Sequence, residues 1–465
     1  MKNWNRRKTI VATDDLPEEH RLKRSLSWPH LVALGVGAIV GTGILVLIGT
    51  AAERAGPAMM LSFAVAGAIC VCAALAYAEV ATMIPASGSA YTYSYVVFGE
   101  LIAWMIGVAL ILEYTLVIST VAVGWSGYAA GFLKSVHMGT ISLALPDIMT
   151  HGPQLAGRAC DGKIQAAAFG INIPAIFIIW VVAGLLIAGT RESAGLNAIL
   201  VVIKIAALAL FVIVALPHFS AANFHPFAPY GFGSGNLHCD GASGSMVTSG
   251  MMAAAAIIFF AFYGFDAIAT AAEEAKNPSR DLAIGIVGSM AICVVIYMAV
   301  AAASIGAVAY TRFSSSAEPL ALILREIGKP WAAQILGASA VIALPTVILA
   351  FFYGQSRIFF VVARDGLLPR SLARVSSRGT PVRITIFTAI VTSVFAGLIP
   401  LASIAALANA GTLAAFVAVL GIVGCIYLFI SLPNRTQMFF FAAQAIGVVL
   451  YMIYGSRAAD RARES

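Results

Sequence analysis

Two ionisable side chains occur inside stretches of sequence that are otherwise apolar. Lys204 lies in the middle of NAILVVIKIAALALFVIVA, and Glu113 lies within LILEYTLV. A lysine about ten residues inside an apolar span is costly, so it usually faces a cavity or a partner. Removal from water favours the neutral amine, which would let Lys204 gain and lose a proton near physiological pH. The alternatives are snorkelling of the lysine toward an interface and a structural, hydrogen-bonded carboxyl at Glu113.

Glycines interrupt the apolar stretch LVALGVGAIVGTGILVLIGT, residues 31–50. The spacing of Gly37 and Gly41 lets two helices pack closely, which is the simpler explanation. The alternative is a helix that unwinds there, so that its freed N–H and C=O groups face a cavity or a ligand. Two half-helices then offer N–H groups to a carboxylate and carbonyls to an ammonium, which suits a zwitterionic amino acid. No strand precedes these glycines, which excludes a nucleotide-binding loop.

A second interruption occurs in MMAAAAIIFFAFYGFDAIAT, where Gly264 stands in an aromatic cluster and Asp266 follows it. The two stretches would each be the first of five helices if the chain contained two inverted repeats. Paired interruptions at matching positions indicate a transport site. Packing explains the glycines of the first stretch well but explains the second stretch poorly.

Membrane-spanning helices would position these residues. Of the 465 residues, 60% are hydrophobic and 11% are charged, and the mean hydropathy is +0.93. A water-soluble protein of this size needs more polar surface. Apolar runs of about 20 residues, the length of a spanning helix, recur along the chain. The predicted spans are 31–51, 57–82, 100–133, 171–189, 194–215, 249–272, 283–309, 333–363, 383–400, 407–431 and 438–455.

The charge distribution predicts an orientation. Basic residues mark the cytoplasmic loops of membrane proteins, so the net charge of +7 does not indicate a nucleic-acid partner. Residues 1–30 are polar and basic, lack the apolar core of a signal peptide, and are predicted to lie in the cytoplasm. The loop 217–248 contains no lysine or arginine and is predicted outside. Cys160 and Cys239 fall in loops predicted outside, where they could form a disulfide.

Five segments resemble the amino acid–polyamine–organocation (APC) superfamily, and within it the bacterial type of the cationic amino acid transporter branch. These are GVGAIVGTGILVLIG, LAYAEVATMIPASGSAYTYSY, ILEYTLVISTVAVGWSGY, FFAFYGFDAIATAAEEAKNPSRDLAIGI and YGQSRIFFVVARDGLLP. The resemblance implies an all-α, LeuT-like 5+5 inverted-repeat fold with broken first and sixth helices, and alternating access by rocking helix bundles. The expected organisation is a tail at 1–30, a transport core at 31–432 with repeats at 31–216 and 249–432, and a C-terminal helix and tail at 433–465.

The resemblance also implies roles for individual residues. Substrate-binding positions are the backbone of Ile39, Val40, Gly41, Thr42 and Gly43, together with Phe260, Ala261, Phe262 and Tyr263. Phe260 is a candidate gate, although ordinary core packing is the alternative for each aromatic residue. Lys204 takes the place that a sodium ion takes in sodium-coupled relatives, which implies proton coupling. Independently of the resemblance, the apolar surroundings of Glu113 suggest that it is buried and is either a proton site or a residue that positions Lys204.

Specificity and gating are expected at further positions. Leu344 should face the substrate side chain, and a bulky apolar residue there favours small neutral amino acids. An inner gate of ion pairs is expected from residues that flank the ends of the second and sixth spans, with a merely solvated face as the alternative. These residues are Glu79, Glu273, Glu274, Lys276 and Arg280.

The C-terminal region departs from the twelve-span pattern of the family. After residue 407 only two spans fit, as though the start of helix ten joined the end of helix eleven. An eleven-span chain places the basic C-terminus outside, against the positive-inside rule, unless the last segment does not span. A missing helix would also leave a groove for a small membrane-peptide subunit.

We therefore predict a proton-coupled secondary active transporter of amino acids in the plasma (inner) membrane. The alternatives are an exchanger or facilitator for cationic amino acids, and a receptor that binds amino acids without moving them. HExxH and GxSxG motifs are absent from the sequence, and the histidines fall in tails and predicted loops. An enzyme, a metal site and a cofactor are therefore not expected.

Overall fold

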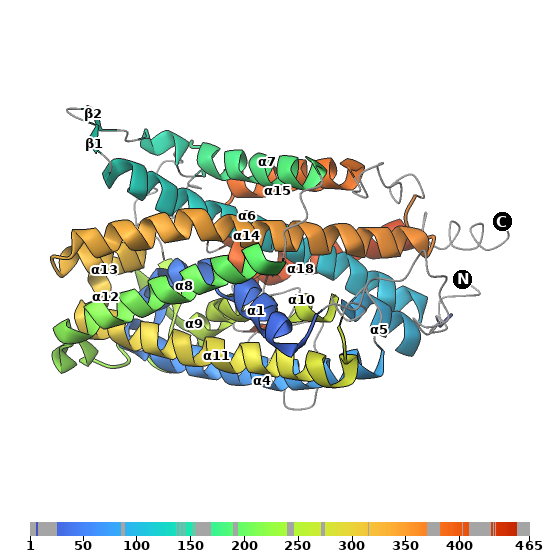
Figure 1. Cartoon of the computed structure of the whole chain (residues 1–465), viewed down its shortest axis with the longest axis horizontal. Helices are drawn as coiled ribbons and strands as arrows, with labels where there is room; N and C mark the ends of the chain where they lie inside the picture. Colours follow the sequence, from blue (N-terminus) through green and yellow to red (C-terminus); the bar gives the residue numbers. More distant parts are fainter. Residues whose placement is uncertain are drawn as a thin grey trace.

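The structure is a computed structural model of the chain, and its fold is mostly helical (Figure 1). Five helical segments among the described residues have the length and composition of a membrane span: Leu47–Met83, Glu100–Lys134, Ile199–His218, Pro278–Ala307 and Pro330–Ala363. The described residues are 6–7, 26–84, 89–135, 137–138, 141–142, 145–150, 152–153, 169–188, 194–239, 246–270, 275–314, 316–369, 382–401, 403–408, 429–430, 432 and 434–452.

The first half of the chain contains a divided first span and four further long or apolar helices. Its helices are α1 (Trp28–Ile39), α2 (Thr42–Leu45), α3 (Leu47–Ala55), α4 (Met59–Met83), α5 (Ser89–Val97), α6 (Glu100–Ser135), α7 (Ile173–Ala188) and α8 (Ala194–Ala215). The chain turns from α3 into α4 at Gly56, whose φ of +59° favours glycine. Two short strands after α6, β1 (His137–Met138) and β2 (Ile141–Ser142), form a hairpin.

The second half begins with another divided span. Its helices are α9 (Met251–Ile258), the 3-10 turn η7 (Phe259–Phe262), α10 (Phe265–Thr270), α11 (Pro278–Ala307), α12 (Tyr310–Phe313), α13 (Pro319–Glu326), α14 (Pro330–Arg364), α15 (Val382–Leu398) and α18 (Asn434–Leu450). The hairpin of β3 (Asn236–Cys239) and β4 (Met246–Ser249) precedes α9. Proline at the first position of α11, α13 and α14 fits helix starts, where its missing N–H costs nothing.

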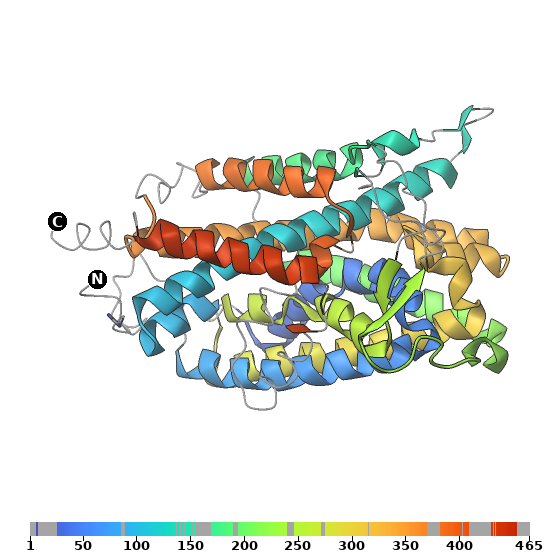
Figure 2. The same ribbon diagram turned by 180° about the vertical axis from the view of Figure 1, so that it is seen from behind.

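The helices form layers along one long axis. Seen from both sides, α7 and α15 lie along one edge, α4 and α11 lie along the opposite edge, and α6 and α14 lie between them (Figure 1, Figure 2). Each of the first nine predicted spans overlaps one or more of the helices from α1 to α15. The expectation of an all-α polytopic fold is confirmed. Most of the predicted span 407–431, where two helices were expected to be fused, lies outside the described residues.

The last helix ends beside the beginning of α6. The hydroxyl of Tyr451, just after α18, donates to Glu100 Oε1 at 3.0 Å, and Tyr95 of α5 donates to Oε2 of the same buried carboxylate at 3.0 Å. Trp104 of α6 also donates to the Gly447 carbonyl at 2.7 Å. The helix therefore ends on the side of the bundle where α6 begins.

Candidate substrate site at two helix breaks

The first helix loses its geometry at two residues. It ends at Ile39, Val40 is extended (φ −72°, ψ 99°), Gly41 has φ −153° and ψ −142°, and α2 begins at Thr42. This is the position that the glycine pattern predicts for an interruption. A helix that stops here leaves its last carbonyls and the first N–H groups of α2 without helical partners.

The second break has a different construction. After α9 the chain tightens into η7, Tyr263 becomes extended (φ −64°, ψ 148°), and Gly264 adopts a φ of +117° before α10 begins. A Cβ on Gly264 would lie 2.8 Å from the carbonyl carbon of Ala38. Both the positive φ and this close approach require glycine.

The two breaks lie against each other. A Cβ on Gly43 would come within 2.3 Å of the Ala261 Cα, so the two backbones meet with no room for a side chain. Tyr297 of α11 donates its hydroxyl to the carbonyls of Ile39 and Ala261, each at 2.9 Å. One buried phenol thus joins the last residue of α1 to the middle of η7. The sequence analysis missed Tyr297, although a tyrosine in the run CVVIYMAVAAAS needs a polar partner once buried.

The residues predicted to bind substrate lie in the two segments that form this contact, residues 39–43 and 260–263, except for Leu344, which is on α14. All of those with side chains are buried and at most 4% exposed: Ile39, Val40, Thr42, Phe260, Ala261, Phe262, Tyr263 and Leu344. The hydroxyl of Thr42 is buried with no hydrogen-bond partner in the part of the chain that the structure describes. A buried hydroxyl of this kind is costly unless another polar group joins it.

The helix α14 places Val347 beside the first break. Val347 lies next to Gly41, since a Cβ built on that glycine would be 3.4 and 3.8 Å from its two methyl groups. Leu344 is buried one turn earlier on the same helix, which continues through Pro345. The α14 side chain nearest to Gly41 is therefore Val347.

Lys204 lies beside the first break. Its side chain is 5% exposed, and Nζ donates to the Gly37 carbonyl at 2.9 Å and to Thr346 Oγ1 at 3.1 Å. Gly37 is in the last turn of α1, where carbonyls lack helical donors and a cation is favourable. The lysine consequently links α8 to both α1 and α14. Its buried position does not fit snorkelling.

Two carboxyl side chains, Glu113 and Asp266, are also buried. Glu113 is buried on α6, as its apolar surroundings in the sequence predict. Its neighbour Tyr114 donates to Asp266 Oδ2 at 2.6 Å, which ties α6 to the first turn of α10. Asp266 was noted in the sequence without a role. Its position directly after the second break is the sequence feature that could have identified it as part of the site.

The predicted inner-gate residues are only partly described. Glu79, Lys276 and Arg280 are exposed, and no ion pair joins them within the described ranges. The backbone N–H of Lys276 donates to the Leu26 carbonyl at 2.8 Å, which holds the chain before α11 against the start of α1. Glu273, Glu274 and Cys160 lie outside the described residues, as does the side chain of Cys239, so the predicted disulfide lies outside them too.

Comparison with known proteins identifies the family. A family model described as amino acid permease matches residues 26–456. The chain is 38% identical to the branched-chain amino acid permease BcaP of Bacillus subtilis, over 96% of each chain. It is 36% identical to the methylthioribose transporter of the same organism, over 98% of this chain and 99% of that one.

A more distant group of relatives is eukaryotic. The chain is 34% identical to the vacuolar cationic amino acid transporter 2 of Arabidopsis thaliana, over 90% of this chain and 62% of that protein. The resemblance to the APC superfamily is thereby confirmed. The chain is a multi-pass membrane protein that belongs to the amino acid permease family.

Proposed function

We propose that this protein carries neutral amino acids across the plasma membrane together with protons, and holds its substrate at the two helix breaks. The observation that carries the proposal is the meeting of two unwound backbones around Gly43 and Ala261. N–H groups at the start of α2 suit a carboxylate, and carbonyls at the ends of α1 and η7 suit an ammonium. The hydroxyl of Thr42, which has no hydrogen-bond partner among the described residues, adds a polar group for the same ligand.

The proposed substrate has an aliphatic side chain. Val347 faces the first break, and an apolar wall of this kind offers nothing to a guanidinium or an ammonium. Two of the relatives are named as branched-chain amino acid permeases, from Bacillus subtilis and from Lactococcus lactis, at 38% and 30% identity. Both observations favour neutral aliphatic amino acids over cationic ones.

Proton coupling is proposed to act through Lys204. As an ammonium it is held by the last turn of α1 and by Thr346 of α14. Loss of the proton removes the charge that suits a helix C-terminus, so α1 is held less firmly against α8 and α14. Binding of a proton would in this way favour one position of α1, which is the element that must move in alternating access. Glu113 is proposed as a second proton site.

The orientation is also part of the proposal. The basic N-terminal residues and Arg383 at the start of α15 lie in segments expected to face the cytoplasm. The loops that contain α12, α13 and β3–β4 would then lie outside.

Uptake into proteoliposomes tests the function. We would measure labelled L-leucine, L-alanine and L-arginine with and without an inward proton gradient. Gradient-driven uptake of leucine or alanine above arginine supports the proposal. Uptake that ignores the gradient identifies an exchanger or facilitator, and binding without uptake identifies a receptor.

A further inference from the structure

A proline interrupts the hydrogen bonding of α14 near the middle of that helix. Pro345 lies inside α14, which continues through it from Pro330 to Arg364. Proline has no backbone N–H, so it cannot donate to the carbonyl of the residue four positions earlier, which is Val341. In a helix that spans a membrane, an unpaired carbonyl is costly because lipid offers no donor. A side chain from a neighbouring helix is therefore needed at this carbonyl.

The indole of Trp125 supplies the donor. Trp125 lies on α6, and its Nε1–H donates to the Val341 carbonyl at 2.9 Å. The side chain is 9% exposed, which differs from the lipid-facing position of a tryptophan that anchors a helix at the membrane surface. A buried indole N–H needs an acceptor, just as a buried carbonyl needs a donor. The two groups satisfy each other across the contact between α6 and α14.

The residues of α14 that follow Pro345 belong to the proposed substrate site. Thr346 comes first and accepts a hydrogen bond from Lys204 Nζ at 3.1 Å. Val347 is next, and its methyl groups lie beside Gly41 of the first break. The positions of both depend on how α14 bends at the proline, because the helix lacks one of its own hydrogen bonds there. A donor that holds the carbonyl left by the proline also holds the turn that follows.

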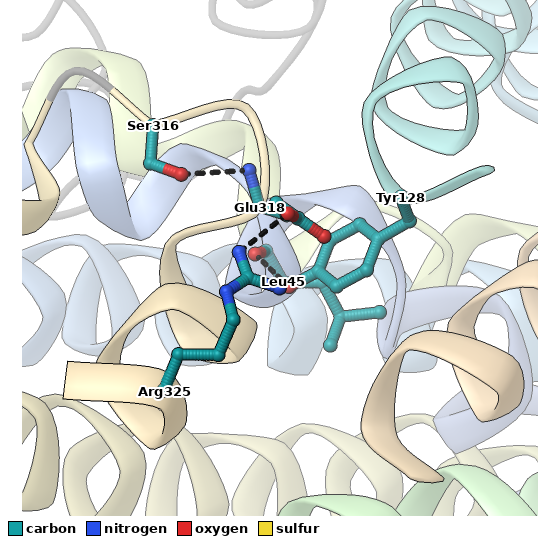
Figure 3. Close-up of polar contacts among 5 residues, drawn as sticks. All are labelled: Leu45, Tyr128, Ser316, Glu318 and Arg325. Atoms are coloured by element: carbon teal, nitrogen blue, oxygen red, sulfur yellow. Dashed lines mark hydrogen bonds and ion pairs between the residues drawn. The ribbon is translucent and has the colours of Figure 1, made fainter. Parts of the chain in front are cut away.

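The same part of α6 holds the segment after the first break. Gly124, which precedes Trp125, packs so closely on Thr42 that a Cβ built on the glycine would lie 2.4 Å from Thr42 Cγ2. One turn later, Tyr128 donates its hydroxyl to the carbonyl of Leu45, the last residue of α2, at 2.8 Å (Figure 3). This turn of α6 therefore contacts α2 directly and contacts α14 through the indole.

We propose that Trp125 is a positioning residue of the substrate site, because its indole replaces the hydrogen bond that Pro345 cannot make and so fixes Val347 beside the first break. The inference rests on the proposed function, since it takes the substrate to bind at that break. Trp125 acts through α14 and not by touching the substrate. The link exists only because a proline occupies position 345. Pro345→Ala provides an N–H within the helix that donates to the Val341 carbonyl in the ordinary way.

A double-mutant cycle tests this exchange of one donor for another. Trp125→Phe removes the indole N–H and keeps an aromatic ring. With Pro345 in place, it should raise the KM of leucine uptake about fivefold or more, with a smaller change in kcat, because a buried carbonyl loses its donor. In the Pro345→Ala background the helix supplies the donor, so the same replacement should raise KM about twofold or less.

Trp104→Phe is the matched control. Trp104 is also buried on α6, and its indole donates to the Gly447 carbonyl at 2.7 Å, so the replacement removes a hydrogen bond of the same kind. The residue four positions after Gly447 is Tyr451 and not a proline. We expect Trp104→Phe to lower the melting temperature equally with and without Pro345→Ala, and to leave the KM of leucine uptake unchanged.

The melting temperature gives a second reading of the cycle that needs no transport. Trp125→Phe should lower it further with Pro345 in place than in the Pro345→Ala background. An unchanged KM in Trp125→Phe, or a penalty of equal size in both backgrounds, would overturn the proposal. If Trp125→Phe does not fold, recovery by Pro345→Ala supports the proposal and failure to recover overturns it. If wild type binds leucine without taking it up, the transport proposal fails, and the Kd of leucine replaces KM in the same cycle.

Discussion

The two helix breaks meet in one place but are built in different ways. The first depends on space: Val40 and Gly41 leave the helix with φ values open to any residue, and only the approach of Ala261 to Gly43 demands glycine. The second depends on space and on backbone conformation, because Gly264 combines a φ of +117° with contact to Ala38. The first also has a cation at its end, Lys204, whereas the second is followed by a carboxyl, Asp266. A break made by packing alone can be relieved by a neighbour's movement, and a break fixed by φ cannot.

The largest effect is expected from Gly264→Ala. An alanine there combines a strained φ, which costs about 1–3 kcal/mol, with a clash against the backbone of Ala38. Uptake should fall to background, and the melting temperature in detergent should drop. Gly288→Ala on α11 is the control, since its Cβ would make only an ordinary 3.5 Å contact with Val32. Normal uptake by Gly264→Ala would show that the second break is not fixed by its backbone.

Gly43→Ala should rank next. The added methyl group meets the Ala261 Cα and Cβ, so the two breaks must move apart, but φ is not strained. We expect a folded protein with severely reduced uptake. Combining it with Ala261→Gly should restore uptake only in part, because the Cα at 2.3 Å remains. Full activity of the single variant would mean that the breaks need not touch during the cycle.

Replacement of Lys204 tests the contact of its charge with the last turn of α1. Lys204→Ala removes the donor to the Gly37 carbonyl, and Lys204→Arg keeps a charge that cannot be lost near neutral pH. Both should abolish stimulation of uptake by an inward proton gradient, while exchange of internal for external substrate persists. Gradient stimulation that survives in Lys204→Arg would place the coupling proton elsewhere, with Glu113 the next residue to replace.

Tyr297→Phe should have a moderate effect that concerns both breaks at once. Loss of the hydroxyl deprives the Ile39 and Ala261 carbonyls of a shared donor, at a cost of about 1–3 kcal/mol for groups left unsatisfied. We expect a lower melting temperature and a several-fold rise in the KM of uptake. Tyr230→Phe, in the loop before α9, is the matched control. Equal KM values in wild type and Tyr297→Phe would reduce the bridge to a packing contact.

Val347→Ala is expected to have the smallest effect. The smaller side chain enlarges the space beside Gly41. Removing one or two methyl groups from such a pocket changes selectivity by about 1–3 kcal/mol at most. The ratio of kcat/KM for leucine over alanine should rise. Leu344→Ala on the same helix should change that ratio less, and the reverse ranking would return the specificity position to Leu344.

The positions of the breaks and of the spans could be predicted from the sequence because glycine and hydropathy act locally. Gly41 and Gly264 interrupt apolar runs, and Lys204 is conspicuous in its run whatever surrounds it. The rotation of a helix could not be predicted in the same way. A helix such as α14 is apolar on most sides, so its pattern does not reveal which side faces the first break.

Contacts between distant segments were equally hidden. The Tyr297 hydroxyl and the Ile39 carbonyl that it contacts are more than 250 positions apart in the sequence. The carboxylate of Glu318 packs against Gly131 of α6, which lies nearly two hundred residues before it. Gly131 reads in the sequence as another small residue in a long helix. Only the folded structure, in which the Glu318 carboxylate occupies the space beside Gly131, shows why a larger residue does not fit there.

The hydrogen bonds of Tyr95 and Tyr451 to Glu100 provide a fixed reference point for distance measurements. Because this carboxylate fixes the end of α18 to the start of α6, a spin label or fluorophore placed near Tyr451 would keep a constant distance from a second probe on α6. A probe on α11 would instead change its distance from the same reference whenever the layer of α4 and α11 tilts. The last helix therefore offers a fixed reference from which the proposed tilting of the opposite layer can be tested in single molecules.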